Sequence, residues 1–171
     1  MSEAATDRML RVDQAGEYGA TRIYQGQLAV MGDRAPHAAE IAAMAEQEAA
    51  HRARFDALIA QRGVRPTALQ PLWSAAGYAL GAATALLGPE AAMACTAAVE
   101  EEIDRHYSKQ LDELGEDDPV LAATVAEFRE DERAHRAAAL AAGAERAPAY
   151  PLLSGAIRLG CRAAIRLSER F

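Results

Sequence analysis

Residues 41–58, IAAMAEQEAAHRARFDAL, contain the most informative pattern in the chain. Side chains three or four places apart lie on one face of a helix. One such face of this segment consists of Ile41, Met44, Glu48, His51, Phe55 and Leu58. Its outer members are apolar, as a core-facing stripe requires, but an acid and an imidazole occupy its centre. The segment therefore predicts a core helix with a polar site at its middle.

A second segment repeats this pattern, and two others add one inward acid each. The corresponding face of 121–139 consists of Leu121, Val125, Phe128, Glu132, His135 and Ala139. Glu17 and Glu100 interrupt two further apolar stripes, 31 and 32 residues before the two Glu-x-x-His pairs. Four helices are therefore expected to direct four glutamates and two histidines into the middle of one bundle.

The two halves of the chain also resemble each other. Six residues recur 83 places later: Ala15, Glu17, Arg22, Tyr24, Gln27 and Leu28 return as Ala98, Glu100, Arg105, Tyr107, Gln110 and Leu111. Three more recur 84 places later: Glu48, His51 and Arg52 return as Glu132, His135 and Arg136. Each half therefore predicts one helix hairpin, and the two hairpins together predict a bundle with approximate twofold symmetry.

Glycines and prolines divide the chain into helices. The predicted helices span about 8–31, 36–62, 90–114 and 119–142, with accessory helices near 72–87 and 152–168. Pro36 suits a first helical position, Gly63 a left-handed helix end, and Asp118-Pro119 a capped helix start. The long connection before Pro89 is typical of ferritin-like bundles with one crossover. We expect one all-α domain over 1–171, a ferritin-like four-helix bundle with one long crossover and two accessory helices.

The six polar side chains on these core faces need a partner that neutralises them. A carboxylate moved into a low-dielectric interior costs several kcal/mol even after relaxation, and no arginine shares these faces at the same level. Two divalent cations balance four carboxylates, and carboxylate with imidazole suits iron or manganese, with zinc an alternative. Ferritin-like two-metal proteins use this ligand set. The predicted metal ligands and catalytic residues are Glu17, Glu48, His51, Glu100, Glu132 and His135.

Within this site, each Glu-x-x-His pair is expected to hold one ion, with Glu17 and Glu100 bridging or capping the ions. Acids expected on solvated faces are Glu46, Glu101, Glu102, Asp104 and Glu130. Two tyrosines and two histidines are also near the site in sequence: Tyr24, Tyr107, His37 and His106. The tyrosines are interpreted as core aromatics in preference to donors to the ligands. His37 is expected to be exposed, and His106 is a candidate for supporting the ligands.

Composition narrows the function further. A chain of 171 residues with a net charge of −7 and a pI near 5.1 is unsuited to general nucleic-acid binding. Cys95 and Cys161 are too few for a disulfide framework or a four-cysteine zinc site. No Gly-rich nicotinamide fingerprint is present. The first residues, MSEAATDRML, lack an apolar signal core, and no uninterrupted apolar span of about 20 residues occurs.

Several longer stretches resemble one known family. They are RVDQAGEYGATRIYQGQ (11–27), EQEAAH (46–51), ALGAATALLG (79–88), AMACTAAVEE (92–101), DERAHR (131–136) and GCRAAIRLSERF (160–171). In this order they resemble the demethoxyubiquinone hydroxylases of ubiquinone biosynthesis. The resemblance implies a carboxylate-bridged di-iron monooxygenase, with two iron ions, that uses O2 to hydroxylate a polyprenyl benzoquinol such as 5-demethoxyubiquinol. The family's ligands fall on the six residues named above.

The resemblance also implies a peripheral membrane protein, because the tail of the substrate lies in lipid. Residues 146–171 carry a net charge of +4, so the rest of the chain carries −11. A basic stripe there consists of Arg158, Arg162, Arg166 and Arg170. This stripe suits an anionic membrane surface, and the alternative is an arginine face packed on the bundle. The expected location is the cytoplasmic face of a bacterial inner membrane, with a lipid-binding or ubiquinone-biosynthesis protein as a further partner.

The uncharged segment 72–87 is either a buried core helix or a surface that dips into the bilayer, where it forms a quinol entrance with the last helix. Two other functions fit the same fold. A ferritin-like ferroxidase or peroxide-handling protein would use the metal ions without a quinol, and storage would require a hollow multimeric shell. A non-catalytic quinone- or lipid-binding scaffold would need no metal, and the two Glu-x-x-His pairs argue against it.

Overall fold

Six α-helices and one short 3-10 turn make up the secondary structure of residues 2–171, the part of the chain that the computed structural model describes. The helices are α1 (Glu3–Met31), α2 (Ala38–Arg62), α3 (Gln70–Leu86), α4 (Pro89–Leu114), α5 (Pro119–Ala141) and α6 (Tyr150–Ser168). The turn η1 (Ala144–Arg146) lies between α5 and α6. No strand occurs within 2–171, so the predicted all-α class is confirmed.

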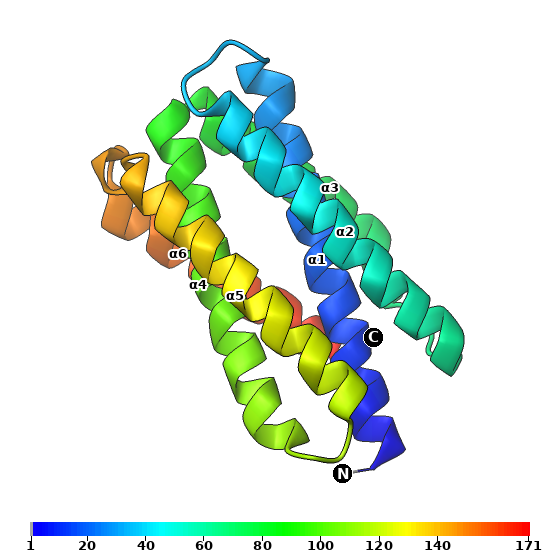
Figure 1. Ribbon diagram of the computed structural model, residues 1–171. Coiled ribbons are helices and arrows are strands. Elements are labelled where there is room, and N and C mark those ends of the chain that lie inside the picture. The colour runs from blue at the N-terminus through cyan, green and yellow to red at the C-terminus, as the bar shows by residue number, and fades with distance from the viewer. Residues whose placement is uncertain (1) are drawn as a thin grey trace.

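The helices form three layers of two (Figure 1). Helix α1 packs against α2, and α4 against α5, as two hairpins whose four helices make the bundle. Helix α3 packs on the side of α1 away from α2, and α6 on the side of α4 away from α5. The chain passes from the first hairpin to the second through α3, which is the predicted crossover.

Local signals explain where the helices begin and end. Gly63 has the left-handed φ of 66° that ends α2 as predicted. The Asp118 carboxylate accepts a hydrogen bond from the backbone N–H of Leu121 at 3.0 Å, which confirms the predicted cap of α5. The prediction that Pro36 is the first residue of a helix was wrong. His37 adopts a left-handed φ of 65°, and α2 begins after it, at Ala38. Helix α1 begins well before residue 8, at Glu3.

Two hydrophobic clusters fill the two ends of the bundle. One contains Tyr24, Ile41, Met44, Met93 and Ala139 among its buried residues. The other contains Leu10, Phe55, Leu58, Tyr107, Leu121 and Phe128. Along each of the four helices, the predicted polar residues lie between the positions that belong to these clusters. The packing therefore places a polar layer at mid-height, with an apolar core above and below it.

Helix α3 combines a closely packed face with an exposed apolar face. A Cβ atom added to Gly81 would lie 1.9 Å from the carbonyl oxygen of Ile23, so α3 and α1 approach backbone to backbone. On the other face, Leu86 is 75% exposed and Leu72 is 52% exposed. No helix within residues 2–171 has both the length and the apolar character that crossing a bilayer requires. Helix α3 is thus packed against α1 on one face and exposes apolar side chains on the other.

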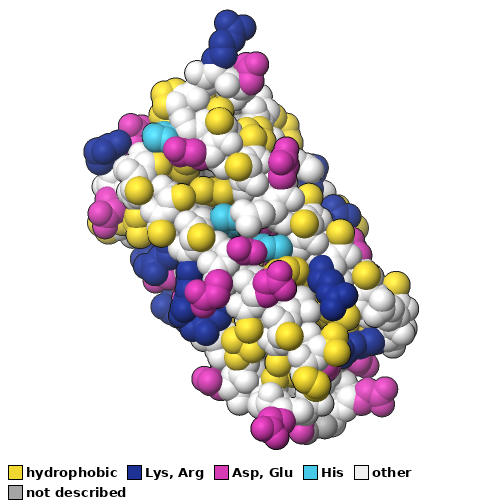
Figure 2. Space-filling view, viewed as in Figure 1, with side chains coloured by type: hydrophobic (Ala, Val, Ile, Leu, Met, Phe, Trp, Pro, Cys, Tyr) yellow, Lys and Arg dark blue, Asp and Glu magenta, His cyan; other side chains and the backbone are white. Residues whose placement is uncertain are grey.

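Two hollows lie on opposite sides of the molecule. An apolar cavity of about 540 Å³ lies between α1, α3, α4 and α6. A more polar groove of about 760 Å³ lies between α2 and α5, on the other side of the α1–α4 layer. Figure 2 shows histidine and acidic side chains gathered where α2 and α5 face each other. The bundle core is thus approached by an apolar hollow on one side and a polar hollow on the other.

Candidate metal centre

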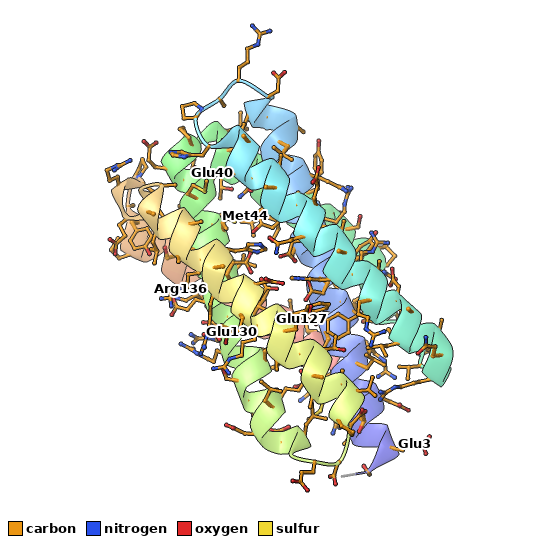
Figure 3. The ribbon with its side chains drawn as sticks, viewed as in Figure 1. Glu3, Glu40, Met44, Glu127, Glu130 and Arg136 are labelled. Atoms are coloured by element: carbon orange, nitrogen blue, oxygen red, sulfur yellow. The ribbon has the colours of Figure 1, made fainter. Side chains whose placement is uncertain are left out.

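All six predicted ligand residues meet in the polar layer of the bundle. Helices α1, α2, α4 and α5 each contribute at least one of these residues, and side chains fill the space between the two hairpins (Figure 3). None of the six is more than 4% exposed, and Glu17, Glu48 and Glu132 have no exposed surface. The helix faces that the sequence defined are therefore the faces that turn inward.

The six residues form two overlapping groups of four. In each group, one possible ligand atom from every residue lies within 4.8 Å of the others. One group is Glu17, Glu48, His51 and Glu132, and the other is Glu48, Glu100, Glu132 and His135. Glu48 and Glu132 belong to both groups, whereas Glu17 and Glu100 belong to one each. This grouping favours shared positions for Glu48 and Glu132 and end positions for Glu17 and Glu100.

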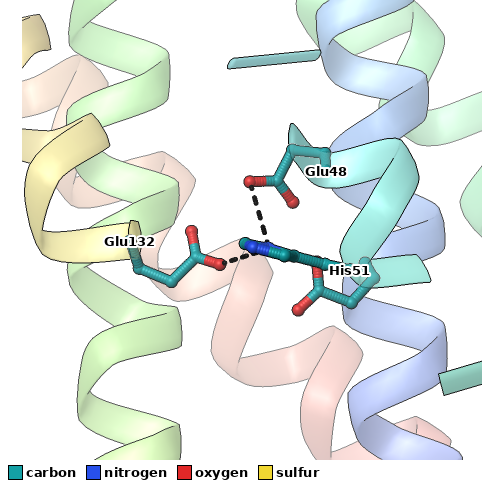
Figure 4. A group of neighbouring side chains, drawn as sticks. Glu48, His51 and Glu132 are labelled. Carbon is teal, nitrogen blue, oxygen red and sulfur yellow. Dashed lines mark ion pairs between the residues drawn. The ribbon is translucent and has the colours of Figure 1, made fainter. Parts of the chain in front are cut away.

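Both imidazoles direct the Nδ1 atom toward carboxylates. The Nδ1 atom of His51 lies 3.3 Å from Glu132 Oε1 and 3.9 Å from Glu48 Oε1 (Figure 4). The Nδ1 atom of His135 lies 3.1 Å from Glu48 Oε1 and 3.6 Å from Glu132 Oε2. Each histidine therefore faces the glutamate of the opposite hairpin as well as its own, which joins the two hairpins at this level.

The other ring nitrogen of each histidine is held from outside by a residue that the sequence reasoning missed. His51 Nε2 donates to Asp131 Oδ2 at 3.0 Å, and His135 Nε2 donates to Gln47 Oε1 at 3.0 Å. Such outer hydrogen bonds fix the ring and leave Nδ1 free to bind a cation. Gln47 and Asp131 are 84 places apart, so the repeat offset was a signal that could have identified them.

Two buried tyrosines hold the end carboxylates. The Tyr24 hydroxyl donates to Glu100 Oε1 at 2.7 Å, and the Tyr107 hydroxyl donates to Glu17 Oε1. Each tyrosine thus reaches from one hairpin to the glutamate of the other, as the sequence repeat requires. Burial, followed by the nearby carboxylates, raises the pKa of both phenols well above the ordinary value, so both remain donors. The tyrosines are core aromatics whose hydroxyls are used by the site.

Many of the possible ligand atoms in this layer form no hydrogen bond. Eight buried side-chain atoms of the six residues have no hydrogen-bond partner within the described chain: Glu17 Oε2, both Glu48 oxygens, His51 Nδ1, Glu100 Oε2, both Glu132 oxygens and His135 Nδ1. Buried polar groups in folded proteins are almost always paired. Lone pairs of carboxylate and imidazole converging on two points fit two divalent cations, and this donor set suits iron or manganese.

Comparison with known proteins agrees with the predicted resemblance. A sequence model of the family described as "Ubiquinone biosynthesis protein COQ7" matches residues 4–168. The chain belongs to this COQ7 family. It is 58% identical over 167 residues to the Rhodospirillum rubrum protein named 3-demethoxyubiquinol 3-hydroxylase, covering 98% of this chain and 79% of the relative.

Two eukaryotic relatives extend this similarity. The Homo sapiens mitochondrial protein named NADPH-dependent 3-demethoxyubiquinone 3-hydroxylase is 51% identical over 174 residues, covering 99% of this chain and 80% of the relative. The Saccharomyces cerevisiae mitochondrial protein named 5-demethoxyubiquinone hydroxylase is 41% identical over 183 residues, covering 98% and 78%. The resemblance stated from the sequence is thereby confirmed, and the helical structure agrees with the ferritin-like architecture that it implied.

Polar residues near the COQ7-type site differ in part from their predicted roles. The prediction of a solvated face was wrong for Glu102, which is 2% exposed and accepts hydrogen bonds from Arg162 Nε and Nη2 at 2.9 and 2.7 Å. Helix α6 folds over it, a contact that no periodicity on α4 could predict. His106 Nε2 contacts Asp13 Oδ1 at 3.2 Å. Glu46 and Glu130 are exposed as predicted.

Burial and the neighbouring carboxylates raise the pKa of the buried glutamates of the centre. Burial, then the neighbouring carboxylates, raises the pKa of Glu17 and Glu100 well above the ordinary value and that of Glu48 to about 7. Burial lowers the pKa of His135, but the close carboxylates of Glu132 and Glu48 outweigh this effect and raise it to about 10. Without cations, the centre therefore retains protons that the unfolded chain would release.

The stability of the metal-free protein is therefore expected to fall as pH rises. Between the ordinary pKa of 4.5 and the folded value near 7, Glu48 binds more proton in the folded state, so its contribution opposes folding increasingly as pH rises through this window. His135 contributes stability below pH 6.5 that is lost as pH rises through about 10. Divalent cations displace these protons, so the increase in Tm caused by metal should grow with pH.

Thermal unfolding of metal-free and metal-loaded protein between about pH 5 and pH 8 measures both trends. A metal-free protein whose Tm rises steadily across this range would contradict the assignment of raised pKa values to the buried carboxylates.

Proposed function

We propose that this chain is an O2-dependent hydroxylase of the demethoxyubiquinol ring in ubiquinone biosynthesis, and that residues 1–171 act as one unit. The family membership and the names of the relatives support the reaction. The observation that carries it is a buried cluster of carboxylates and imidazoles, with ligand atoms that form no hydrogen bond, beside an apolar cavity. In the balanced reaction, one oxygen atom enters the ring and the other leaves as water. Two electrons come from a reductant, which the name of the Homo sapiens relative gives as NADPH.

Two iron ions would be held by the six converging residues Glu17, Glu48, His51, Glu100, Glu132 and His135. When bound, iron supplies the activation of O2 that amino-acid side chains lack. The chain's own contribution is to hold the ligands. Tyr24 and Tyr107 fix the two end carboxylates, and Asp131 and Gln47 fix the two imidazoles. The apolar clusters above and below the layer shield it from solvent at the two ends of the bundle.

The apolar cavity is the proposed quinol site. Its volume of about 540 Å³ is within the range of small-molecule sites. Gly16 and Val99 line it and directly precede Glu17 and Glu100, so a ring in the cavity lies against the helices that carry the end ligands. A Cβ atom added to Gly16 would meet no atom within 4 Å, so the missing side chain leaves room on that side. The cavity thus presents an apolar ring to the metal centre.

Contact with a lipid surface is the second part of the proposal. Most large exposed apolar side chains lie on or beside α3 and α6: Leu72, Tyr78, Leu86, Leu87, Leu152, Leu159, Leu167 and Phe171. These two helices flank the cavity, so a quinol tail can remain in lipid while its ring is inside. We propose a peripheral protein at the cytoplasmic face of a bacterial inner membrane. The lipid-binding partner protein stays a prediction.

The basic stripe contributes less to this surface than the sequence suggested. Arg158 donates to Glu101 at 3.1 Å, and Arg162 forms a paired contact with Glu102. These two arginines therefore hold α6 on the bundle, which was the alternative interpretation of the stripe. In our proposal, the exposed leucines supply most of the binding to lipid, and Arg166 and Arg170 supply the attraction to anionic headgroups.

The test is hydroxylation of a short-tailed demethoxyquinol by iron-loaded protein with NADPH and isotopically labelled O2. Incorporation of one labelled oxygen atom per product supports the proposal. Iron-loaded protein that incorporates no label into the quinol would overturn it. A large cage that accumulates oxidised iron would instead support the storage function, and a chain that binds quinol but no metal would support the scaffold.

Filling the cavity should stop the reaction without disturbing the metal. Ala164 lines the cavity, whereas its neighbour Ala163 is exposed and does not. We expect Ala164→Trp to lower the rate of quinol hydroxylation by at least about tenfold, because the ring loses its position. Its metal content should remain that of the unmodified protein. Ala163→Trp is the matched control, and equal activity in the two variants would contradict the proposed quinol site.

A further inference from the structure

The groove between α2 and α5 has no role in the proposed reaction, yet it leads to the metal ligands. Helices α2 and α5 carry the two Glu-x-x-His pairs, and the groove of about 760 Å³ runs between them. Its polar lining consists of Gln47, His51, Arg54, Thr124, Glu127 and Asp131. At the base of the groove, His51 is 3% exposed. The groove therefore connects solvent with a residue of the first four-residue group.

A divalent cation cannot reach this centre easily from the other side. Hydrated cations lose water only when oxygen or nitrogen ligands replace it. The lining of the cavity beside α3 and α6 is almost entirely apolar, and the carboxylate of its one charged residue, Glu102, is already paired with Arg162. The cavity suits a quinol and offers no succession of ligands to an ion.

The groove offers such a succession. Glu127 is exposed and lies one helical turn before Asp131 on the same side of α5. Asp131 Oδ2 contacts His51 Nε2 at 3.0 Å, and on the inner side of the same ring Nδ1 has no hydrogen-bond partner and lies 3.3 Å from Glu132. Figure 3 shows Glu127 on the side of α5 that faces α2, and Glu130 on the other side. Carboxylates thus mark a path from solvent to the unpaired ligand atoms.

We propose that the α2–α5 groove is the route by which hydrated divalent metal ions enter the centre, with Glu127 and Asp131 as successive oxygen ligands along it. The inference rests on the proposed metal centre. It assigns the groove to metal ions and the apolar cavity to the quinol. Metal ions load from the polar side, and the quinol enters from the apolar side. The acids of the groove outnumber its single cation, Arg54, which favours a positively charged cargo.

A steric block of the groove tests the route. Ala123 lines the groove on α5, whereas Ala126 is exposed on the same helix outside it. Metal-free full-length protein is mixed with Co²⁺ in a stopped-flow instrument, and the absorbance of bound Co²⁺ is followed. We expect Ala123→Trp to slow uptake by about tenfold or more, because the groove must first open. The final number of bound ions should be unchanged, and Ala126→Trp should load at the rate of the unmodified protein.

A charge change tests the role of the carboxylates. We expect Glu127→Gln to slow uptake by about two- to fivefold at low ionic strength, with the difference shrinking in high salt. Glu130→Gln is the matched control, because Glu130 is exposed on α5 and contacts Arg133 outside the groove. Equal rates for Glu127→Gln and Glu130→Gln at low salt would remove Glu127 from the route.

The cavity variant Ala164→Trp separates the two sides. It should take up Co²⁺ at the rate of the unmodified protein while losing quinol hydroxylation. If Ala123→Trp loads at the unmodified rate, or if Ala164→Trp is the slow variant, the groove is not the route and the inference falls while the proposed function stands. If the unmodified protein binds no Co²⁺ and no iron, the metal centre itself is wrong, and both fall together.

Discussion

Replacing Glu48 with alanine is expected to abolish binding of both metal ions, whereas replacing Glu17 should leave one ion bound. Glu48 belongs to both four-residue groups and Glu17 to one. Both Glu48 oxygens are buried and accept no hydrogen bond, so both are available as ligands to the two ions. Metal content after anaerobic reconstitution measures the difference directly. Quinol hydroxylation should fall to background in both variants, because each lacks a complete two-metal centre.

Glu46 on the same helix provides the control for these variants. Glu46→Ala removes an exposed acid from the same helix and should retain two ions and full activity. Loss of a single ion in Glu48→Ala, or of both in Glu17→Ala, would contradict the shared position of Glu48. The same reasoning places Glu132 with Glu48 and Glu100 with Glu17, so four single variants test the grouping completely.

In the metal-free protein, Glu48 should destabilise the folded state. Its carboxylate is desolvated and lies among other carboxylates, so its charged form destabilises the folded state. Glu48→Gln should therefore raise the Tm of the metal-free protein by about 2–4 °C, which corresponds to about 1 kcal/mol for a chain of this size. Metal should no longer raise the Tm of this variant. A centre that destabilises its own apo form is one that selection for stability alone would not keep.

The bundle could be predicted from the sequence because one periodicity carries both fold and site. Each core face has to be apolar along a helical stripe, so Glu48 and His51 in the middle of such a stripe indicated a buried helix and a cation together. The repeat added that Glu132 and His135 face them from a second hairpin. These inferences depend only on spacing within a helix, which the sequence states directly.

What could not be predicted depends on contacts between helices. The pairing of Arg162 with Glu102 follows from where α6 crosses α4, and nothing within either segment indicates that crossing. The assignment of Asp131 to His51 and of Gln47 to His135 likewise requires the angle between the hairpins. The boundary at His37 was missed because a left-handed φ at a residue other than glycine carries little signal in sequence.

The contact between α3 and α1 is the second place where a small change should have a large effect. These helices approach through glycine, because a Cβ atom on Gly81 would lie 1.9 Å from Ile23 O and one on Gly26 would lie 2.2 Å from Tyr78 O. The atoms in the way belong to backbone, which cannot rotate aside as a side chain can. Helix α3 also forms one wall of the apolar cavity, through Ala76, Gly77 and Leu80. Separation of α3 from α1 would therefore deform the proposed quinol site.

Gly81→Ala should accordingly destabilise the protein by about 2–3 kcal/mol, because a buried backbone clash forces the helices apart. The expected fall in Tm is about 4–12 °C, and thermal unfolding of the metal-loaded protein measures it. Gly155→Ala is the matched control: Gly155 is helical, and an added Cβ would meet nothing within 4 Å. That variant should gain up to about 1 kcal/mol in stability, since alanine is the better helix former.

Helix α3 carries none of the six ligands, so Gly81→Ala should keep both metal ions while quinol hydroxylation falls. An unchanged Tm in Gly81→Ala would mean that α3 does not pack on α1 at this distance. The proposed position of α3 as a wall of the cavity would then be wrong.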